Sequence, residues 1–361
     1  MSDRLFVATR KGLFAVERSA GRWIVGEPSF LGDPVSAVLP DARDGTLYAA
    51  LNLGHFGVKM RRSTDGGKTW DEHAVPTYPP QPENLPEGAP PWKLVQIWVL
   101  ESGGASETGV LWAGTNPGGL FRSVDRGETW TLNESLWNRP ERAEWFGGGY
   151  DSPGIHSICV DPRDSRVVTV GISCGGVWRT RDGGSTWQLL GKGLKAPYMP
   201  PERVDDPNIQ DVHRLVSCRS RPEVFWLQHH AGVYRSGDRA ESFETVQPPL
   251  SSFGFAVAVD PNDAQTAWFV PAIKDETRVP VGAQLAVTRT RDGGATFDVL
   301  RDGLPGSSYD LVYRHGLDVD ASGQRLAIGS TTGGLWISEN RGDSWHCVSA
   351  HLPPIHAVRF A

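Results

Sequence analysis

The stretch Gly154–Trp187, GIHSICVDPRDSRVVTVGISCGGVWRTRDGGSTW, holds one complete copy of a unit that recurs along the chain. Runs of β-branched and apolar residues alternate in it with turn residues, which is typical of short antiparallel strands. The last turn, Asp182-Gly183-Gly184, is a tight hairpin that leads into Trp187. The strands that this unit predicts are Ile155–Val160, Val167–Ile172 and Val177–Thr180.

The hairpin sequence recurs with the pattern Ser/Thr-x-Asp-x-Gly-x-Ser/Thr-Trp/Phe. In each turn we expect the Asp to accept hydrogen bonds from backbone N–H groups, the Gly to adopt a positive φ, and the aromatic residue to begin the next strand. These aspartates are therefore predicted to stabilise turns rather than to catalyse. The six copies are Ser63–Trp70, Ser123–Trp130, Thr180–Trp187, the weaker Ser236–Phe243 and Thr290–Phe297, and Ser338–Trp345 with Asn340 in the Asp position.

This pattern resembles the Asp-box, or BNR repeat, of sialidase-like β-propellers. The same box occurs in sialidases, in xyloglucanase-type glycosidases, in sortilin-type receptors and in a photosystem assembly factor. The resemblance implies the fold. It says little about activity, because proteins with different activities share the box.

The box-to-box spacing falls from about 60 to about 50 residues, which suits four-stranded blades with loops of variable length. The segment 354–360 is a strand with nothing after it, whereas 5–16 is a second and third strand with no inner strand before them. We therefore expect an all-β fold, one seven-bladed β-propeller of four-stranded antiparallel blades, closed by pairing of the two chain ends. The expected blades are 4–32 with 354–360, 34–76, 93–137, 154–194, 211–249, 254–303 and 309–351.

Composition narrows the classes of partner. The net charge of −6 provides no basic surface for nucleic acid, and no apolar run approaches the roughly 20 residues that span a bilayer. The four cysteines form no metal-binding CxxC pair, and the N-terminus does not have the pattern of a signal peptide. We expect a cytoplasmic protein that acts on a small molecule, with a monomer as the simplest assembly and the oligomeric state left open.

Histidines recur at one position of the unit. Counting five residues back from the position of Asp161 places His156 on the inner strand, and the same offset selects a histidine in three other blades. Equivalent inner-strand positions form a ring at the tunnel mouth, where neutral imidazoles suit Fe, Zn, Cu, Ni or Mn. The alternative is that the imidazoles hydrogen-bond to each other, to water and to backbone. The seven positions are Ser36, Gln96, His156, His213, Phe255, His315 and His356, and the predicted ligands of a divalent transition metal are His156, His213, His315 and His356.

Loops at the same mouth supply candidate substrate-binding residues. Lys274 and Arg278 would bind an anionic substrate, with a solvated charge cluster as the alternative. At most one of His229 and His230 is expected to face the tunnel. Asp151, Asp211 and Asp310 are candidates to orient ligating rings, with an ordinary loop cap as the favoured alternative for each. The candidates are Arg10, Asn116, Tyr150, Asp151, Ser173, Cys174, His229, His230, Lys274, Arg278, Tyr309, Asp310 and Arg314.

Three functions are compatible with these features. The favoured one is a metal-dependent enzyme acting on a small organic substrate by oxygen, hydrolytic or lyase chemistry. The second is a glycoside hydrolase of the sialidase type. The segment Val7–Gly12 lacks the Arg-Ile-Pro signature of sialidases, however, and the spacing of Arg10, Arg278 and Arg314 does not indicate an arginine triad. Xyloglucanase-type enzymes use two propellers, whereas one is expected here. The third is a non-catalytic binding or assembly module.

Overall fold

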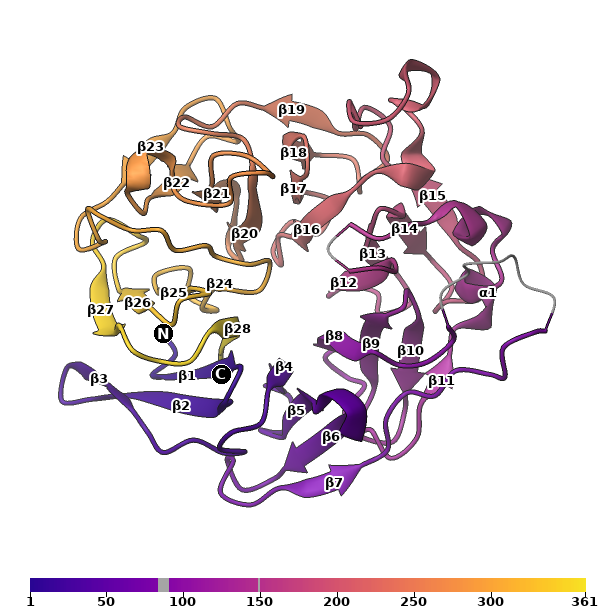
Figure 1. The fold of residues 1–361 in the computed structure, drawn as a ribbon, viewed down its shortest axis with the longest axis horizontal. Helices are drawn as coiled ribbons and strands as arrows, with labels where there is room; N and C mark the ends of the chain where they lie inside the picture. The colour runs from indigo at the N-terminus through magenta and orange to yellow at the C-terminus, as the bar shows by residue number, and fades with distance from the viewer. Residues whose placement is uncertain (84–90, 149) are drawn as a thin grey trace.

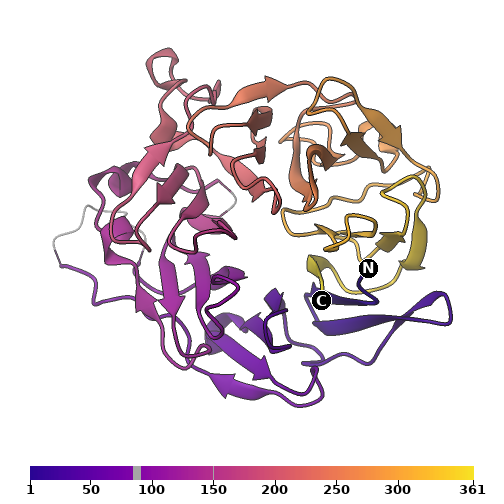
Figure 2. The ribbon, with the colours of Figure 1, turned by 180° about the vertical axis from the view of Figure 1, so that it is seen from behind.

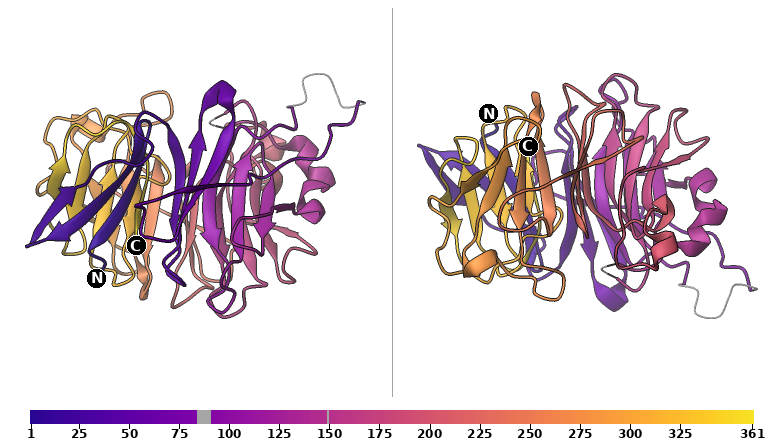
Figure 3. Two further views of the ribbon diagram at one scale, coloured as in Figure 1. Left: turned by 90° about the horizontal axis from the view of Figure 1, so that it is seen from below. Right: turned by 90° about the horizontal axis from the view of Figure 1, so that it is seen from above.

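Seven four-stranded antiparallel sheets stand in a closed ring around a central axis (Figure 1). A computed structural model describes residues 1–83, 91–148 and 150–361. Seen from behind, the inner strands again surround one central opening, and the side views show a short, thick disc (Figures 2 and 3). The predicted seven-bladed propeller is confirmed.

Each sheet is one blade, with one edge strand at the axis and the opposite edge strand at the rim. The strands, blade by blade from the axis outward, are β28 (Ile355–Phe360), β1 (Arg4–Thr9), β2 (Gly12–Ser19) and β3 (Arg22–Val25); β4 (Val35–Pro40), β5 (Leu47–Asn52), β6 (Val58–Ser63) and β7 (Asp71–His73); β8 (Gln96–Ser102), β9 (Leu111–Asn116), β10 (Leu120–Ser123) and β11 (Thr131–Leu132); β12 (Gly154–Val160), β13 (Val168–Ser173), β14 (Gly176–Thr180) and β15 (Gln188–Leu190); β16 (Val212–Ser217), β17 (Phe225–His229), β18 (Gly232–Ser236) and β19 (Glu244–Val246); β20 (Gly254–Asp260), β21 (Asp263–Pro271), β22 (Val287–Thr290) and β23 (Asp298–Leu300); and β24 (Leu317–Val319), β25 (Leu326–Gly329), β26 (Leu335–Ser338) and β27 (His346–Ser349).

Helical segments are short and lie in the connections between strands. They are η1 (Gly54–Phe56), α1 (Glu134–Trp137), η2 (Pro140–Glu144), η3 (Pro201–Arg203), η4 (Pro207–Ile209) and η5 (Val281–Ala283). In the part of the chain that the structure describes, none of the helices has the length and apolar character needed to cross a membrane.

The chain ends close the ring as predicted. β28 pairs antiparallel with β1, with Phe360 opposite Leu5 and Val358 opposite Val7. The C-terminal strand therefore fills the inner position of the blade that the N-terminal strands begin. This pairing leaves no strand edge unpaired between the two ends.

The boxes stabilise their turns in the predicted way. In the central copy, the Thr186 backbone N–H and side-chain hydroxyl donate to the Asp182 carboxylate at 2.9 and 2.6 Å, and the Gly184 N–H donates to the Thr180 hydroxyl at 2.8 Å. In the last copy, Asn340 accepts from the Ser344 N–H through Oδ1 and donates to the Ser344 hydroxyl through Nδ2. An amide thus replaces the carboxylate without loss of the turn.

Tryptophans fill the space between neighbouring blades. Three box indoles, Trp70, Trp130 and Trp187, link blades through hydrogen bonds, as where Trp187 donates to the side chain of Asn133 at 2.7 Å. Other indoles are fully enclosed by apolar clusters, and an aromatic ring of this size dominates the packing around it. The scaffold beneath the tunnel mouth is therefore well packed. The largest enclosed indoles are Trp112, Trp178, Trp226 and Trp268.

Most inner strands carry a β-bulge near their start. In β12 the register passes from Ile155–Ile172 to Ser157–Gly171, so His156 has no cross-strand partner. A bulge re-aims its extra side chain. In the third blade the bulged residue is Trp98 and not the predicted Gln96, because the strand begins two residues later than the landmarks suggested. Bulges with a single extra residue hold Ser36, Trp98, His156, His213 and His356.

Candidate functional site

Two cavities open near the tunnel mouth. An axial cavity of about 610 Å³ includes Trp98, Tyr150, Tyr313 and Arg314 in its wall. A second cavity of about 620 Å³ lies among the fourth, fifth and sixth blades, which we call the lateral cavity. Loops that enter inner strands and turns that join second to third strands build it. The lateral cavity is lined by Phe146, Gly147, Gly148, Cys174, Tyr198, Asp211, His230, Ala231, Ser251, Ser252, Phe253, Ile273, Lys274, Asp275 and Glu276.

The bulged histidines hydrogen-bond to main-chain carbonyls of neighbouring blades. His156 Nε2 donates to the Val212 carbonyl at 2.7 Å, and its Nδ1 contacts the Ser157 hydroxyl at 3.0 Å. His213 Nδ1 donates to the Gly254 carbonyl at 2.6 Å, and His356 Nδ1 donates to the Val35 carbonyl at 3.0 Å. One shared position thus joins blade to blade.

His315 reaches across the tunnel. Its Nε2 donates to the carbonyl of His156 at 2.8 Å, and Arg214 donates to the same carbonyl. Burial lowers the pKa of both His156 and His315 well below the ordinary value, so these rings are neutral at physiological pH.

The four predicted metal ligands do not meet at one point. Within the described residues, the donor atoms that do lie within 4.8 Å of one another belong to a different group, Asp211, His213 and His230. Bulges aim His156, His213 and His356 along the ring at the next blade, whereas His315, which is not at a bulge, is taken up by the carbonyl of His156 across the tunnel. The prediction of a divalent metal therefore stays a prediction, with its four-histidine ligand set replaced by this one.

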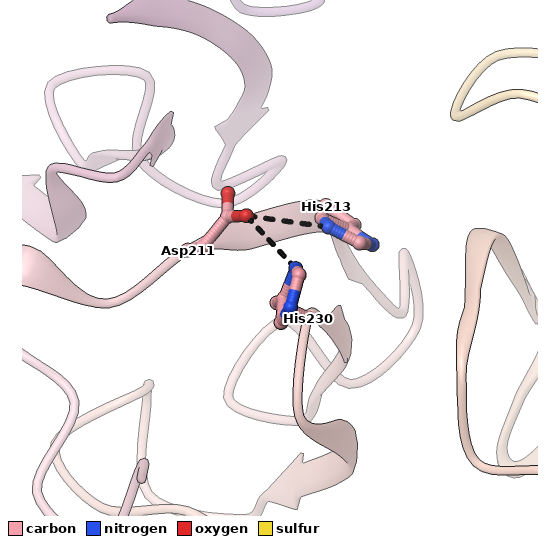
Figure 4. Close-up of side chains that lie close together, drawn as sticks. All are labelled: Asp211, His213 and His230. Carbon is pink, nitrogen blue, oxygen red and sulfur yellow. Dashed lines mark ion pairs between the residues drawn. The ribbon is translucent and has the colours of Figure 1, made fainter. Parts of the chain in front are cut away.

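The group Asp211, His213 and His230, which we call the blade-five cluster, comes from one blade (Figure 4). Asp211 immediately precedes β16, His213 is the bulged residue of β16, and His230 lies in the turn between β17 and β18. His213 Nε2 and His230 Nδ1 each lie 3.4 Å from the same carboxylate oxygen, Oδ2 of Asp211. Three donor atoms therefore converge beside the lateral cavity.

Aromatic rings hold the two imidazoles in place. His213 stacks on Phe255 with centroids 4.5 Å apart, and the edge of Phe253 meets both imidazoles at 5.7 and 5.8 Å. His230 also meets Tyr198 edge to face at 5.0 Å. Packing on several sides fixes the direction of the ring nitrogens.

Charges around the cluster favour an ionised carboxylate. Burial alone would raise the pKa of Asp211, but His213, His230 and Arg314 hold it well below the ordinary value. The hydrogen bond with Asp211 raises the pKa of His230, whereas burial lowers the pKa of His213. Burial, reinforced by Asp211, raises the pKa of the Cys174 thiol, so this cysteine is a poor nucleophile.

Glycines allow a loop to cover the carboxylate. A Cβ on Gly148 would lie 2.6 Å from the Ser173 hydroxyl, 2.8 Å from the Cys174 sulfur and 2.9 Å from Asp211 Oδ1. Only a residue without a side chain can therefore pass so close. The Gly147-Gly148 loop forms one wall of the lateral cavity above Asp211.

A buried arginine lies in the wall of the axial cavity. The guanidinium carbon of Arg314 is 5.0 Å from the Trp98 ring centroid and 5.3 Å from that of Phe255. Its Nε has no hydrogen-bond partner within the described residues, although the residue is only 7% exposed. A buried donor without a partner faces a cost that a polar ligand in the cavity would remove.

The predicted substrate-binding residues divide between the cavities and the framework. Ser173 is buried outside both linings and donates weakly to Asp211 at 3.4 Å. Asp151 and Tyr309 are exposed outside both linings. Of the predicted residues, those that line the axial cavity are Arg10, Tyr150, Arg278 and Arg314, and those that line the lateral cavity are Cys174, His230 and Lys274.

Three other candidates have framework roles. Asn116 donates to the Ser152 carbonyl at 2.9 Å and braces the loop before β12. Asp310 accepts from Ser330 at 2.7 Å, as an ordinary loop cap does. His229 is buried and accepts from the Ala231 N–H at 2.9 Å, so His230 is the member of that pair that faces the cavity.

Sequence reasoning missed several lining residues. Trp98 was hidden by the register error in the third blade, and Tyr198 and Phe253 lie in loops whose length carries no repeat landmark. A usable signal was present for the blade-five cluster. Asp211 stands two residues before His213, and the pair Asp-x-His could have been read together with His230 as a ligand set.

Comparison with known proteins identifies the repeat. Residues 61–72 match the family model described as BNR/Asp-box repeat. A xyloglucanase from Acetivibrio thermocellus is 24% identical over 232 residues, which is 64% of this chain and 21% of that protein. A xyloglucanase from a Paenibacillus species is 34% identical over 79 residues, 21% of this chain and 7% of that one. The chain thus spans about a fifth or less of the length of these curated relatives.

Solved structures share the fold across nearly the whole chain. The GH74 xyloglucanase from Xanthomonas campestris superposes with a TM-score of 0.66 at 18% identity, covering 97% of this chain and 53% of that one. YCF48 from Cyanidioschyzon merolae superposes with a TM-score of 0.58 at 15% identity, covering 94% and 96%. At these identities the likeness concerns the fold.

Proposed function

Because this chain is an Asp-box (BNR-repeat) β-propeller, we propose that it is a glycoside hydrolase that binds an oligosaccharide of the xyloglucan type at the tunnel mouth. The observation that carries the proposal is the pairing of an axial cavity walled by aromatic, amide and arginine side chains with a lateral cavity that holds a buried carboxylate. The similarity to two xyloglucanases supports the substrate class.

The axial cavity has the composition of a sugar site. The faces of Trp98, Tyr150 and Tyr313 offer flat apolar surfaces for the C–H faces of pyranose rings. Gln96 accepts from the Tyr150 hydroxyl at 3.1 Å, and it can exchange that partner for a sugar hydroxyl. The free Nε of Arg314 supplies a further donor. The hydroxyls of an oligosaccharide can accept hydrogen bonds from Arg10, Arg278 and Arg314, which also line this cavity.

The lateral cavity supplies the chemistry. Hydrolysis breaks the bond between the anomeric carbon and the leaving oxygen; water adds its hydroxyl to the carbon and a proton goes to the leaving oxygen. Most glycosidases use two carboxyl groups, one that protonates the leaving oxygen and one that stabilises the positive charge on the sugar or activates the water. Asp211, the buried and ionised carboxylate of this cavity, is proposed for the second role, and Asp275 and Glu276 in the same lining are the candidates for the first.

The test is hydrolysis of xyloglucan and its oligosaccharides, followed by reducing-end release and by mass spectrometry of the products. We expect turnover by the wild-type protein and a loss of at least about 100-fold in kcat/KM for Asp211→Asn, since a buried charge in the reacting site is removed. Asp164→Asn changes an exposed ion pair with Arg166 in a turn at the opposite ends of the strands and serves as the matched control. Absence of both turnover and calorimetric binding would reject the proposal, and binding without turnover would favour a binding module instead.

A further inference from the structure

We propose that Asp211, His213 and His230 bind one divalent transition-metal ion, zinc or iron(II), at the wall of the lateral cavity. The inference does not depend on the proposed hydrolysis and gives Asp211 a different role, because an ion bound to this carboxylate takes up the charge that the hydrolysis would use; metal binding can be measured without any sugar. Two imidazoles and one carboxylate form the ligand set of many catalytic zinc and non-haem iron sites.

The distances within the cluster suit a shared ion. Both nitrogen-to-oxygen separations are 3.4 Å, longer than the 2.7–3.2 Å of an ordinary N–H···O hydrogen bond. Two ligands about 2.1 Å from a tetrahedral zinc ion lie about 3.4 Å from each other. The two nitrogen-to-oxygen separations therefore suit a common metal, and all three donor atoms lie within 4.8 Å of one another.

The hydrogen bonding of His213 also supports a bound ion. Its Nδ1 donates to the Gly254 carbonyl at 2.6 Å, so this nitrogen carries the ring proton. Nε2 is therefore the nitrogen turned towards Oδ2 of Asp211, 3.4 Å away, and it is the atom that would bind the ion. A backbone carbonyl on the far nitrogen is also the usual outer partner of a metal-bound histidine.

The surroundings leave room for a reactant. His213 and Asp211 are 2% and 3% exposed, and the stacked Phe255 holds the His213 ring, so two ligands are fixed before an ion arrives. Asp211 and His230 line the lateral cavity, which leaves the remaining coordination positions open to water or a ligand. Three protein ligands with an open side describe a catalytic centre rather than a closed structural one.

The experiment is metal analysis of the untagged, full-length protein after chelator treatment and equilibration with zinc, iron(II) or cobalt(II). We expect one ion per chain, with X-ray absorption showing two nitrogens and a carboxylate oxygen at about 2.0–2.2 Å from zinc. Asp211→Asn and His230→Gln should each lower the affinity for the ion at least about 100-fold. Loss of a residue that only supports a ligand costs up to about 100-fold, and loss of a ligand itself should cost no less. His346→Gln, an exposed outer-strand histidine, is the matched control and should bind normally.

A second variant separates this site from the four-histidine ring. His356→Gln removes a ring histidine outside the blade-five cluster, and we expect it to bind the ion as the wild type does. Metal-free thermal unfolding of each variant identifies any loss that comes from misfolding. Failure of the wild type to retain any of the three ions would overturn the inference. So would an ion that His356→Gln loses and His230→Gln keeps.

Discussion

The fourth and fifth blades place a histidine at the same bulge and surround it differently. His156 is fully buried and has a partner on each ring nitrogen, whereas His213 bonds to a carbonyl through one nitrogen and faces Asp211 through the other. By strand register, Asp211 corresponds to Gly154 of the fourth blade and His230 to Ser173. The difference between a structural histidine and a candidate metal ligand therefore comes from two neighbouring side chains, Asp211 and His230.

The largest effect is expected from removing the structural histidine. His156→Ala leaves the Val212 carbonyl without its donor and opens a void, which should lower the free energy of unfolding by about 3–4 kcal/mol. Urea unfolding in chelator and in zinc should show the same loss, because His156 lies outside the blade-five cluster. A loss of unfolding free energy seen only in zinc would instead indicate that His156 is a metal ligand, and the two histidines would then not differ in role.

A smaller loss of stability is expected at Gly154, the position of the fourth blade that corresponds to Asp211 in the fifth, because the fourth blade has no room there for a side chain. A Cβ on Gly154 would lie 2.5 Å from the Trp98 ring, so Gly154→Ala should cost about 1–3 kcal/mol of unfolding free energy. Gly237→Ala, at a glycine of the fifth blade with open space around it, is the control and should change stability little. If both variants unfold like the wild type, steric exclusion does not distinguish the blades.

The smallest effect is expected at the boxes, which the two blades share. Hydrogen bonds from the side chain and backbone of Thr186 lower the pKa of Asp182 to about 2. A carboxyl whose folded pKa lies below its unfolded value of about 3.9 stabilises the fold fully above that value and loses the contribution as the pH falls towards 2.

Asp182→Asn should therefore lower the melting temperature slightly at neutral pH, and the difference from wild type should shrink between pH 4 and pH 2. The variant still folds, because Asn340 already occupies this position in the last box. Melting curves across this pH range check the prediction. A difference that grows on acidification would show that the charge of the box carboxylate destabilises the native state.

The sequence predicted the fold fully and the candidate site only in part. The repeated hairpin, the spacing of its copies and the complementary chain ends predicted seven closed blades, since each depends on local turn chemistry or on strand order. The same repeat placed His156, His213, His315 and His356 near one another around the tunnel. It did not determine where their ring nitrogens point.

The sequence alone determined the architecture because six of the seven blades repeat one local turn, with an Asp or Asn in it and an aromatic residue after it. Only the tertiary structure decided the candidate site. A single extra residue in each bulge turns an imidazole towards the next blade, and a loop of variable length brings Asp211 and the aromatic walls around His213 and His230. Bulge direction and loop packing depend on contacts between distant parts of the chain, which carry no period in the sequence.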